Sequence, residues 1–270
     1  MANIIRSAKS GSDWEKNELK AYNITVSSLS LERFFPTPAP SLEHIDPNIL
    51  NTPIGTEGYP AISDAAAEYL CYLGIAAATA QESDVDLFVL MTLRLLRFNE
   101  RNTAVLFRQT IPLFICGDPT RAAQTDVCLS HLPSSIFLCL VEDKTLRNKT
   151  GDVEAQIIAE AIAAFQTNNK RCGAHNLDPL GFMNIPCITM AGTQATFYVV
   201  PVTTELSDAV AAGLYPATRT KVLRCRNPAG RGRRNSTGMD DVMYRKLALK
   251  YLFAFKTLAK NHWVRFLEEV

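Results

Sequence analysis

The sequence lacks a charge excess, a cysteine pair and any cysteine–histidine cluster. With 28 basic and 27 acidic residues among 270, its net charge of +1 gives no sign of a nucleic-acid-binding surface from bulk charge. None of the seven cysteines belongs to a CxxC pair, and no Cys/His spacing is typical of zinc. Several cysteines stand in apolar runs, so we expect buried, reduced thiols of an intracellular protein.

Apolar runs long enough for a secretory signal or a membrane span are also missing. The chain starts with the polar stretch MANIIRSAKSGSDWEKNE, so we expect the sequons at Asn23 and Asn235 to be chance matches. We therefore expect a protein of the cytoplasm or nucleus that has no membrane partner.

Three common catalytic motifs are absent as well. The sequence contains no GxSxG elbow, no GxxxxGK[ST] phosphate loop and no dinucleotide fingerprint. It has no internal repeat, and its only compositional bias is a basic segment at residues 219–234. These absences argue against nucleophile-elbow hydrolases and against the common nucleotide-binding folds.

What the sequence does contain is a succession of helical and strand periodicities. Strands separated by a helix can pair in parallel, and consecutive strands form hairpins, so we predict an α/β fold with a mixed central sheet flanked by helices. Residues 61–215 would form the core, residues 1–60 an extension that wraps it, and residues 216–270 a basic segment and a helix packed on it. The predicted helices are 63–80, 83–98, 153–168, 205–212 and 240–259, and the predicted strands are 21–29, 104–116, 124–130, 135–143, 186–192 and 195–203.

Acidic residues interrupt one predicted hairpin, QTDVCLSHLPSSIFLCLVEDK at residues 124–144. Its second strand ends in Glu142, Asp143 and Lys144, either because it runs out into solvent or because it borders an active site. Side chains alternate along a strand, so Glu142 and Lys144 share one face and Asp143 takes the other. A turn near Pro133 sets Asp126 opposite residues 140–142, which places Asp126, Glu142 and Lys144 together.

This group of residues suits a hard divalent cation. Two adjacent carboxylates repel unless a cation lies between them, and Mg²⁺ or Mn²⁺ takes oxygen ligands. The backbone carbonyl of Asp143 offers a further oxygen, and the Lys144 ammonium can position water or neutralise charge on phosphorus. The arrangement predicts metal-assisted phosphodiester hydrolysis, with Asp126 and Glu142 as metal ligands.

The helix at 153–168 is apolar on nearly all sides, which is typical of a helix buried on more than one side. Its main polar exceptions are Gln156 and Glu160, at positions i and i+4. They point either into the same polar pocket as the strand acids or to an exposed edge of the helix.

The pattern Asp126, then Glu142-Asp143-Lys144 at the end of an apolar strand, resembles the D…ExK signature of the PD-(D/E)XK nuclease superfamily. The predicted order of elements over residues 82–203 resembles the αβββαβ core of this restriction-endonuclease-like fold. Thr125 stands where the signature often has proline. The whole chain also resembles uncharacterised proteins of mushroom-forming fungi, for which no activity is implied.

The resemblance implies a nuclease that uses Mg²⁺ or Mn²⁺, in which Lys144 orients the attacking water. Gln156 resembles the helix glutamine of several branches of the superfamily, and Glu160 would support the site from the same helix. An acid of the first core helix often joins such sites; Asp86 is the favoured match, with Glu82 and Asp84 as alternatives.

The basic segment RTKVLRCRNPAGRGRR contains seven Arg or Lys residues and no acid. Clustered cations beside flexible glycines suit a phosphate backbone, and a solvated loop or a nuclear localisation signal are the other interpretations. Its candidate nucleic-acid contacts are Arg224, Arg226, Arg231, Arg233 and Arg234.

The leading hypothesis is thus a metal-dependent nuclease that cuts DNA or RNA as a monomer or a homodimer. One alternative is an inactive domain of the same fold that binds nucleic acid or protein through its terminal extensions. Another is an unrelated enzyme whose pocket contains a buried ion pair.

Overall fold

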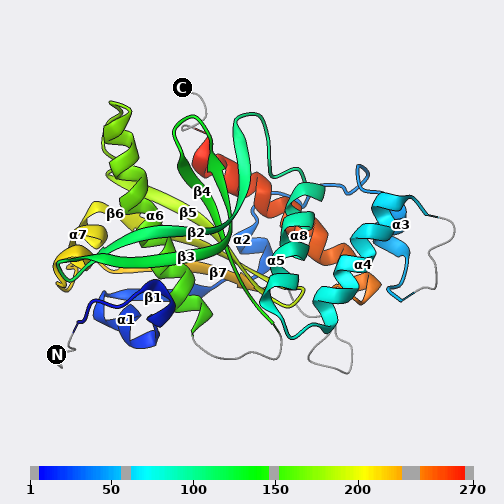
Figure 1. The fold of residues 1–270 in the computed structure, drawn as a ribbon, viewed down its shortest axis with the longest axis horizontal. Helices are drawn as coiled ribbons and strands as arrows, with labels where there is room; N and C mark the ends of the chain where they lie inside the picture. Colours follow the sequence, from blue (N-terminus) through cyan, green and yellow to red (C-terminus); the bar gives the residue numbers. More distant parts are fainter. Residues whose placement is uncertain (1–5, 56–61, 146–151, 227–237, 265–270) are drawn as a thin grey trace.

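Seven strands form one mixed sheet, and helices cover both of its faces (Figure 1). A computed structural model describes residues 6–55, 62–145, 152–226 and 238–264. The strands are β1 (Ile24–Ser28), β2 (Thr103–Ile115), β3 (Asp118–His131), β4 (Ile136–Lys144), β5 (Phe182–Ala191), β6 (Gln194–Thr203) and β7 (Thr220–Arg226). The helices are the 3-10 turn η1 (Gly11–Asp13), α1 (Lys16–Ala21), α2 (Leu31–Phe34), α3 (Pro47–Asn51), α4 (Asp64–Ala78), α5 (Glu82–Leu95), α6 (Val153–Ala174), α7 (Thr204–Ala212) and α8 (Val242–Trp263).

The strand order is β1-β7-β6-β5-β4-β3-β2. Strands β2, β3 and β4 form an antiparallel meander, and β4 then pairs in parallel with β5. Helix α6 makes the connection between β4 and β5, as a parallel pair requires. The predicted fold class, an α/β protein with a mixed sheet flanked by helices, is confirmed.

The two faces of the sheet carry different helices (Figure 1). Helix α6 packs along one face against β2, β3, β4 and β5, and we call this the α6 face. Helix α5 packs against β3 and β4 on the opposite side, with α8 against β5 and β6, and we call this the α5 face. The two faces therefore meet different helices at the end of β4, where the acidic residues lie.

Helix α6 is buried on more than one side, as its apolar periphery predicts. The sheet covers its inner side, and the N-terminal segment packs beside it. A Cβ on Gly11 would lie 2.8 Å from the Cβ of Ala123 in β3 and 3.7 Å from that of Ala159 in α6, so only glycine allows this close approach. Trp14 follows and is fully buried. The polar side chains of α6 consequently have few routes to solvent.

Strand β7 corrects the prediction of an irregular basic segment. Its buried residues Val222 and Cys225 hold it in the sheet between β1 and β6, although its cations resemble those of a solvated loop. The sheet thus takes strands from all three sequence segments, with β1 from residues 1–60 and β7 from residues 216–270.

The seven cysteines are all free thiols, and Cys71 is the only one of them that is fully exposed. Cys128, Cys139 and Cys187 are buried because their strands, β3, β4 and β5, are covered on both faces of the sheet. Among the described residues, no helix combines the length and the apolar character needed to cross a membrane.

Candidate metal centre

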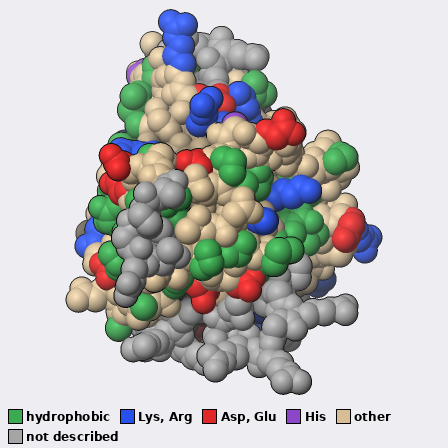
Figure 2. Space-filling model, turned by 90° about the vertical axis from the view of Figure 1, so that its right-hand side faces the viewer, with side chains coloured by type: hydrophobic (Ala, Val, Ile, Leu, Met, Phe, Trp, Pro, Cys, Tyr) green, Lys and Arg blue, Asp and Glu red, His purple; other side chains and the backbone are tan. Residues whose placement is uncertain are grey.

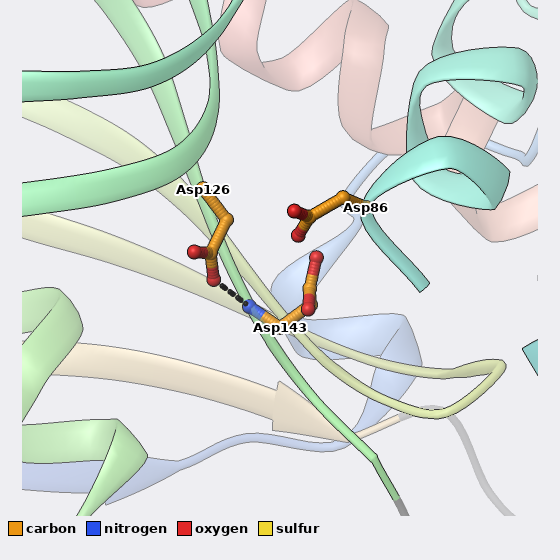
Figure 3. A group of neighbouring side chains, drawn as sticks. All are labelled: Asp86, Asp126 and Asp143. Atoms are coloured by element: carbon orange, nitrogen blue, oxygen red, sulfur yellow. Dashed lines mark hydrogen bonds between the residues drawn. The ribbon is translucent and has the colours of Figure 1, made fainter. Parts of the chain in front are cut away.

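Strands β3 and β4 separate where the acidic residues begin. Their pairing runs as far as Val127 opposite Val141, and continuing it would set Asp126 opposite Glu142. Beyond that pair, the Asp143 backbone N–H donates to Asp126 Oδ2 at 2.9 Å (Figure 3). The Asp126 carboxylate thus replaces a backbone acceptor, so it lies in the gap between the strands.

Thr125 stabilises this opening. Its hydroxyl donates to the carbonyl of Val141 on the neighbouring strand at 3.1 Å and to that of Val127 at 3.0 Å. A proline at this position has no hydroxyl to make these bonds. Thr125 therefore connects the two strands where their regular pairing ends.

Three aspartates meet on the α5 face. Asp86 of α5, Asp126 of β3 and Asp143 of β4 each offer a carboxylate oxygen, and these oxygens lie within 4.8 Å of one another. Figure 3 shows Asp86 and Asp143 directed toward each other, with Asp126 beside them. We call these residues the acid trio. Asp86 and Asp143 are buried, and Asp126 is half-buried.

The position of Asp143 differs from the expectation that it would offer only its backbone. Alternation along β4 does turn its side chain away from Glu142, but the opposite face carries Asp86. Its carboxylate therefore joins the acid trio. Strand periodicity predicts the direction of a side chain but not which helix packs over that face.

Asp86 is the acid of α5 that reaches the trio, as favoured from the sequence. Asp84 instead accepts a hydrogen bond from the Thr79 hydroxyl at 2.6 Å. Glu82 Oε1 lies 3.6 Å from Lys144 Nζ. The three acids of this helix thus lie in three different environments.

A second group of polar side chains lies on the α6 face. Lys144 Nζ lies 2.8 Å from Glu142 Oε1, and Glu160 of α6 is close enough to Glu142 to interact with it. Glu142 and Glu160 are fully buried, whereas Gln156 is half-buried and near Glu160. We call Glu142, Lys144, Gln156 and Glu160 the Glu–Lys group. Glu160 thus lies beside Glu142 and not on an exposed edge of the helix, and half-buried Gln156 lies near it.

Burial changes the acidity of these carboxyls. It raises the pKa of Glu142 to about 8, with the nearby charge of Asp126 adding to the effect. It raises the pKa of Asp143 to about 11, where Asp86 and Asp126 add to it, and raises the pKa of Glu160 well above its usual value. Burial also raises the pKa of Asp126, although the hydrogen bond from Asp143 opposes this. Without a cation, most of these carboxyls hold protons at neutral pH.

Lys144 is the opposite case. Burial lowers its pKa, but the charges of Glu142 and Asp126 outweigh burial and raise the pKa above its ordinary value. Lys144 therefore stays an ammonium ion at neutral pH, fixed beside Glu142.

The donor atoms of the cluster fit a hard divalent cation. Within the described residues, both carboxylate oxygens of Asp143 and of Glu160, and Oδ1 of Asp86, are buried and accept no hydrogen bond. Buried oxygens without donors are costly unless a cation or water pairs with them. Carboxylates from three different elements, with few other protein ligands, match the way Mg²⁺ and Mn²⁺ are commonly held.

Arg108 of β2 belongs to the site, and the sequence interpretation missed it. Its Nε and Nη2 donate to Asp86 Oδ2 at 3.2 and 2.9 Å. This bond raises the pKa of the guanidinium, and the charges of Asp126 and Asp143 add to that. An isolated arginine in a strand otherwise rich in apolar residues was the only available signal, because its acidic partner lies on a helix.

The basic residues divide into three cases. Arg224, expected to bind nucleic acid, has its guanidinium 2.6 Å from Glu154 and also donates to the Ser28 hydroxyl. Arg226 is exposed at the end of β7. Arg231, Arg233 and Arg234 lie outside the described residues.

Strand register relates Arg226 to the site. Glu142 pairs with Thr189, Thr189 with Thr196, and Thr196 with Arg226, so all four lie in one row across the sheet. Three strand spacings of about 4.8 Å put the two ends of the row about 14 Å apart. Strand β7 therefore brings the basic segment to the same end of the sheet as the acidic cluster.

No protein-family model and no curated protein matches the chain. The assignment of a chemistry thus depends on the geometry of the cluster itself.

Proposed function

We propose that the protein is a metal-dependent nuclease that hydrolyses phosphodiester bonds of DNA or RNA. The observation that supports this most strongly is the acid trio, whose carboxylate oxygens lie within 4.8 Å of one another beside Lys144. The D…ExK pattern, with its PD-(D/E)XK resemblance, supports the same reaction class. The protein would work in the cytoplasm or nucleus, as a monomer or a homodimer.

In this proposal Asp86, Asp126 and Asp143 hold the cation, and Glu142 approaches it from the α6 face. A bound Mg²⁺ or Mn²⁺ would polarise a phosphoryl oxygen and lower the pKa of a bound water. Glu142, whose pKa is about 8, is suited to exchange a proton near neutral pH. Lys144 orients the attacking water and neutralises charge that develops on phosphorus. Gln156 and Glu160 position Glu142 and Lys144.

Nucleic acid would approach along the row that leads from Glu142 to Arg226. At the end of the molecule that carries α3 and α4, acidic and basic side chains are intermixed, which favours no phosphate backbone there (Figure 2). Arg226 extends from the end of the sheet that holds the acids, and Arg231, Arg233 and Arg234 follow it in the sequence. These four arginines would contact phosphate.

Calorimetry with Mn²⁺ tests the proposal most directly. The wild type should bind the ion, and Asp126→Ala should lose the binding while keeping its circular dichroism spectrum. In the same buffers, the wild type should cut plasmid DNA or single-stranded RNA, and Lys144→Ala should not. Absence of Mn²⁺ binding by the wild type would contradict the proposal.

The alternative, an inactive domain that binds nucleic acid or protein, is favoured by one observation. Two cations of the chain itself, Arg108 and Lys144, already pair with acids of the cluster. If the wild type binds Mn²⁺ but cuts neither DNA nor RNA, and Lys144→Ala changes nothing, this alternative is the better description.

A further inference from the structure

Arg108 occupies an unusual backbone position beside the acid trio. Its neighbours Phe107 and Gln109 pair with Val127 and Thr125, so Arg108 lies opposite Asp126 on the adjoining strand. Its φ of 44° is in the left-handed region, which costs free energy for a residue with a Cβ. A strained arginine in the interior of a strand, opposite a candidate metal ligand, indicates a position held by surrounding contacts.

The contact that holds Arg108 uses only part of Asp86. Both guanidinium donors converge on Asp86 Oδ2, while the buried Oδ1 accepts no hydrogen bond from the described residues. A bidentate contact would use both oxygens of Asp86. This end-on contact leaves Oδ1 of Asp86 available for another ligand.

The two partners also differ in burial. The Asp86 side chain is 6% exposed, whereas that of Arg108 is 56% exposed. Arg108 therefore reaches a buried acid from the solvent side and can leave without opening the core. Lys144, the other cation of the cluster, is only 16% exposed and is fixed between Glu142 and Glu82.

A divalent ion in the acid trio and the guanidinium would compete for Asp86. Mg²⁺ holds its ligand oxygens at about 2.0–2.1 Å, so the ion would lie within a few ångströms of the guanidinium now on Oδ2. Two positive groups at that distance repel, and the more exposed group is the one that can move.

We propose that Arg108 is a built-in counter-ion of the metal site that exchanges places with the ion. Without metal, Arg108 neutralises Asp86. When metal binds, Arg108 releases Asp86 and turns outward to bind a phosphate oxygen of the nucleic acid, for which its fork is suited. This inference rests on the proposed metal-dependent function and adds a residue that links metal binding to substrate binding.

Mn²⁺ calorimetry on Arg108→Gln tests the first half of the exchange. The variant should bind Mn²⁺ at least about fivefold more tightly than the wild type, the effect of removing one charge a few ångströms away even at the dielectric of water. Arg108→Gly, which suits the left-handed φ, should behave alike if the glutamine variant folds poorly. Arg121→Gln, which removes an exposed arginine paired with Asp118 in the same hairpin, is the control and should leave the affinity unchanged.

Oligonucleotide binding tests the second half. With Ca²⁺ as the probe ion, fluorescence anisotropy of a short single-stranded DNA should show weaker binding by Arg108→Gln, and a salt slope lower by about one unit. Arg121→Gln should retain the wild-type affinity and slope.

The outcomes separate this inference from the proposed function. Tighter Mn²⁺ binding by Arg108→Gln than by the wild type, with weaker DNA binding, supports the exchange. Equal or weaker Mn²⁺ binding by Arg108→Gln overturns the exchange alone, since the metal site remains. If neither protein binds Mn²⁺, both the exchange and the proposed function are wrong.

Discussion

The acid trio and the Glu–Lys group both lie at the end of β4, but their buried acids are neutralised by different kinds of cation. The acid trio takes its acids from three elements, and its cation, Arg108, comes from the solvent side. The Glu–Lys group places acid and cation two residues apart on one strand, and Lys144 is largely enclosed. The counter-ion of the trio is therefore replaceable and that of the Glu–Lys group is not. In the proposed function, this difference favours an ion on the α5 face and leaves a fixed ammonium on the α6 face.

Asp126→Asn should have the largest effect on metal binding and cleavage, because Asp126 lies where the acid trio meets the Glu–Lys group. Losing its charge removes a metal ligand and also the partner that helps hold Lys144 charged. We expect loss of detectable Mn²⁺ binding and a fall in cleavage rate of about 10³-fold or more, measured with a fluorescent oligonucleotide.

Asp118→Asn is the matched control, since Asp118 lies on the same strand far from the cluster. It should bind Mn²⁺ and cleave as the wild type does. Full Mn²⁺ affinity in Asp126→Asn would mean that Asp126 is not a ligand of the ion and does not connect the acid trio to the Glu–Lys group.

Two substitutions on neighbouring residues should separate the role of the acid trio from that of the Glu–Lys group. Asp143→Asn should weaken Mn²⁺ binding by about 10- to 100-fold, because it alters a carboxylate of the trio. Lys144→Met should keep Mn²⁺ affinity but lower the cleavage rate by about 10²-fold, because it removes a cation that acts on the reacting phosphate. Calorimetry and single-turnover cleavage measure the two effects. If both variants lose the same property, the division between the faces is wrong.

The pH dependence of stability should reveal the buried carboxyls. The pKa of Glu142 is raised from 4.5 to about 8, so its stabilising contribution is complete below about pH 4.5 and is lost as the pH rises toward 8. In this window Glu142 should lower the free energy of unfolding of the metal-free protein by at most about 1.4 kcal/mol per pH unit, and Asp143 and Glu160, whose pKa values are also raised, should add to the fall. Thermal unfolding at several pH values measures it.

Glu142→Gln should reduce that fall by the contribution of Glu142, because glutamine does not titrate, whereas Asp143 and Glu160 still do. Saturating Mn²⁺ should also reduce the fall, since the ion binds the ionised carboxylates. A metal-free wild type that becomes more stable between pH 5 and pH 8 would contradict the raised pKa.

Glu160→Gln should have the smallest effect and should be stabilising. Glu160 is fully buried and must take up a proton on folding at neutral pH, a cost that a neutral amide of similar shape avoids. We expect a gain of about 1 kcal/mol in the free energy of unfolding without metal, measured by chemical denaturation.

The control for this substitution lies on the same helix. Glu154→Gln breaks the ion pair with Arg224 and should lower stability slightly. A stabilising effect of the same size in both variants would show that Glu160 is not under strain from its acidic neighbours.

Much of the fold was predictable because its elements follow local rules. Ser63 caps α4, with its hydroxyl accepting from the backbone N–H of Ala66, and Gly213 ends α7 at a left-handed φ of 68°. The meander and the crossover helix were predicted from strand and helix periodicities. Strand β7 was missed because its cations, not its buried Val222 and Cys225, dominated the composition.

The acidic cluster was predicted in part. Asp126, Glu142 and Lys144 lie close together because hairpin register and alternation are local properties. The ion pair of Arg224 was not predicted because its acidic partner, Glu154, lies 70 residues away in the chain. Arg108 was missed for the same reason, since its partner Asp86 is on α5.

The sequence by itself determined the class of fold, the hairpin and the opposite directions of Glu142 and Asp143, because periodicity and short-range register need no other part of the chain. Only the tertiary structure decided what each side chain meets. Packing of α5 over one face brought Asp86 to Asp143 and to Arg108 of β2, and packing of α6 over the other enclosed Glu142 with Glu160. Which helix covers which face follows from burial of the whole apolar surface, a property of the folded chain and not of any local stretch.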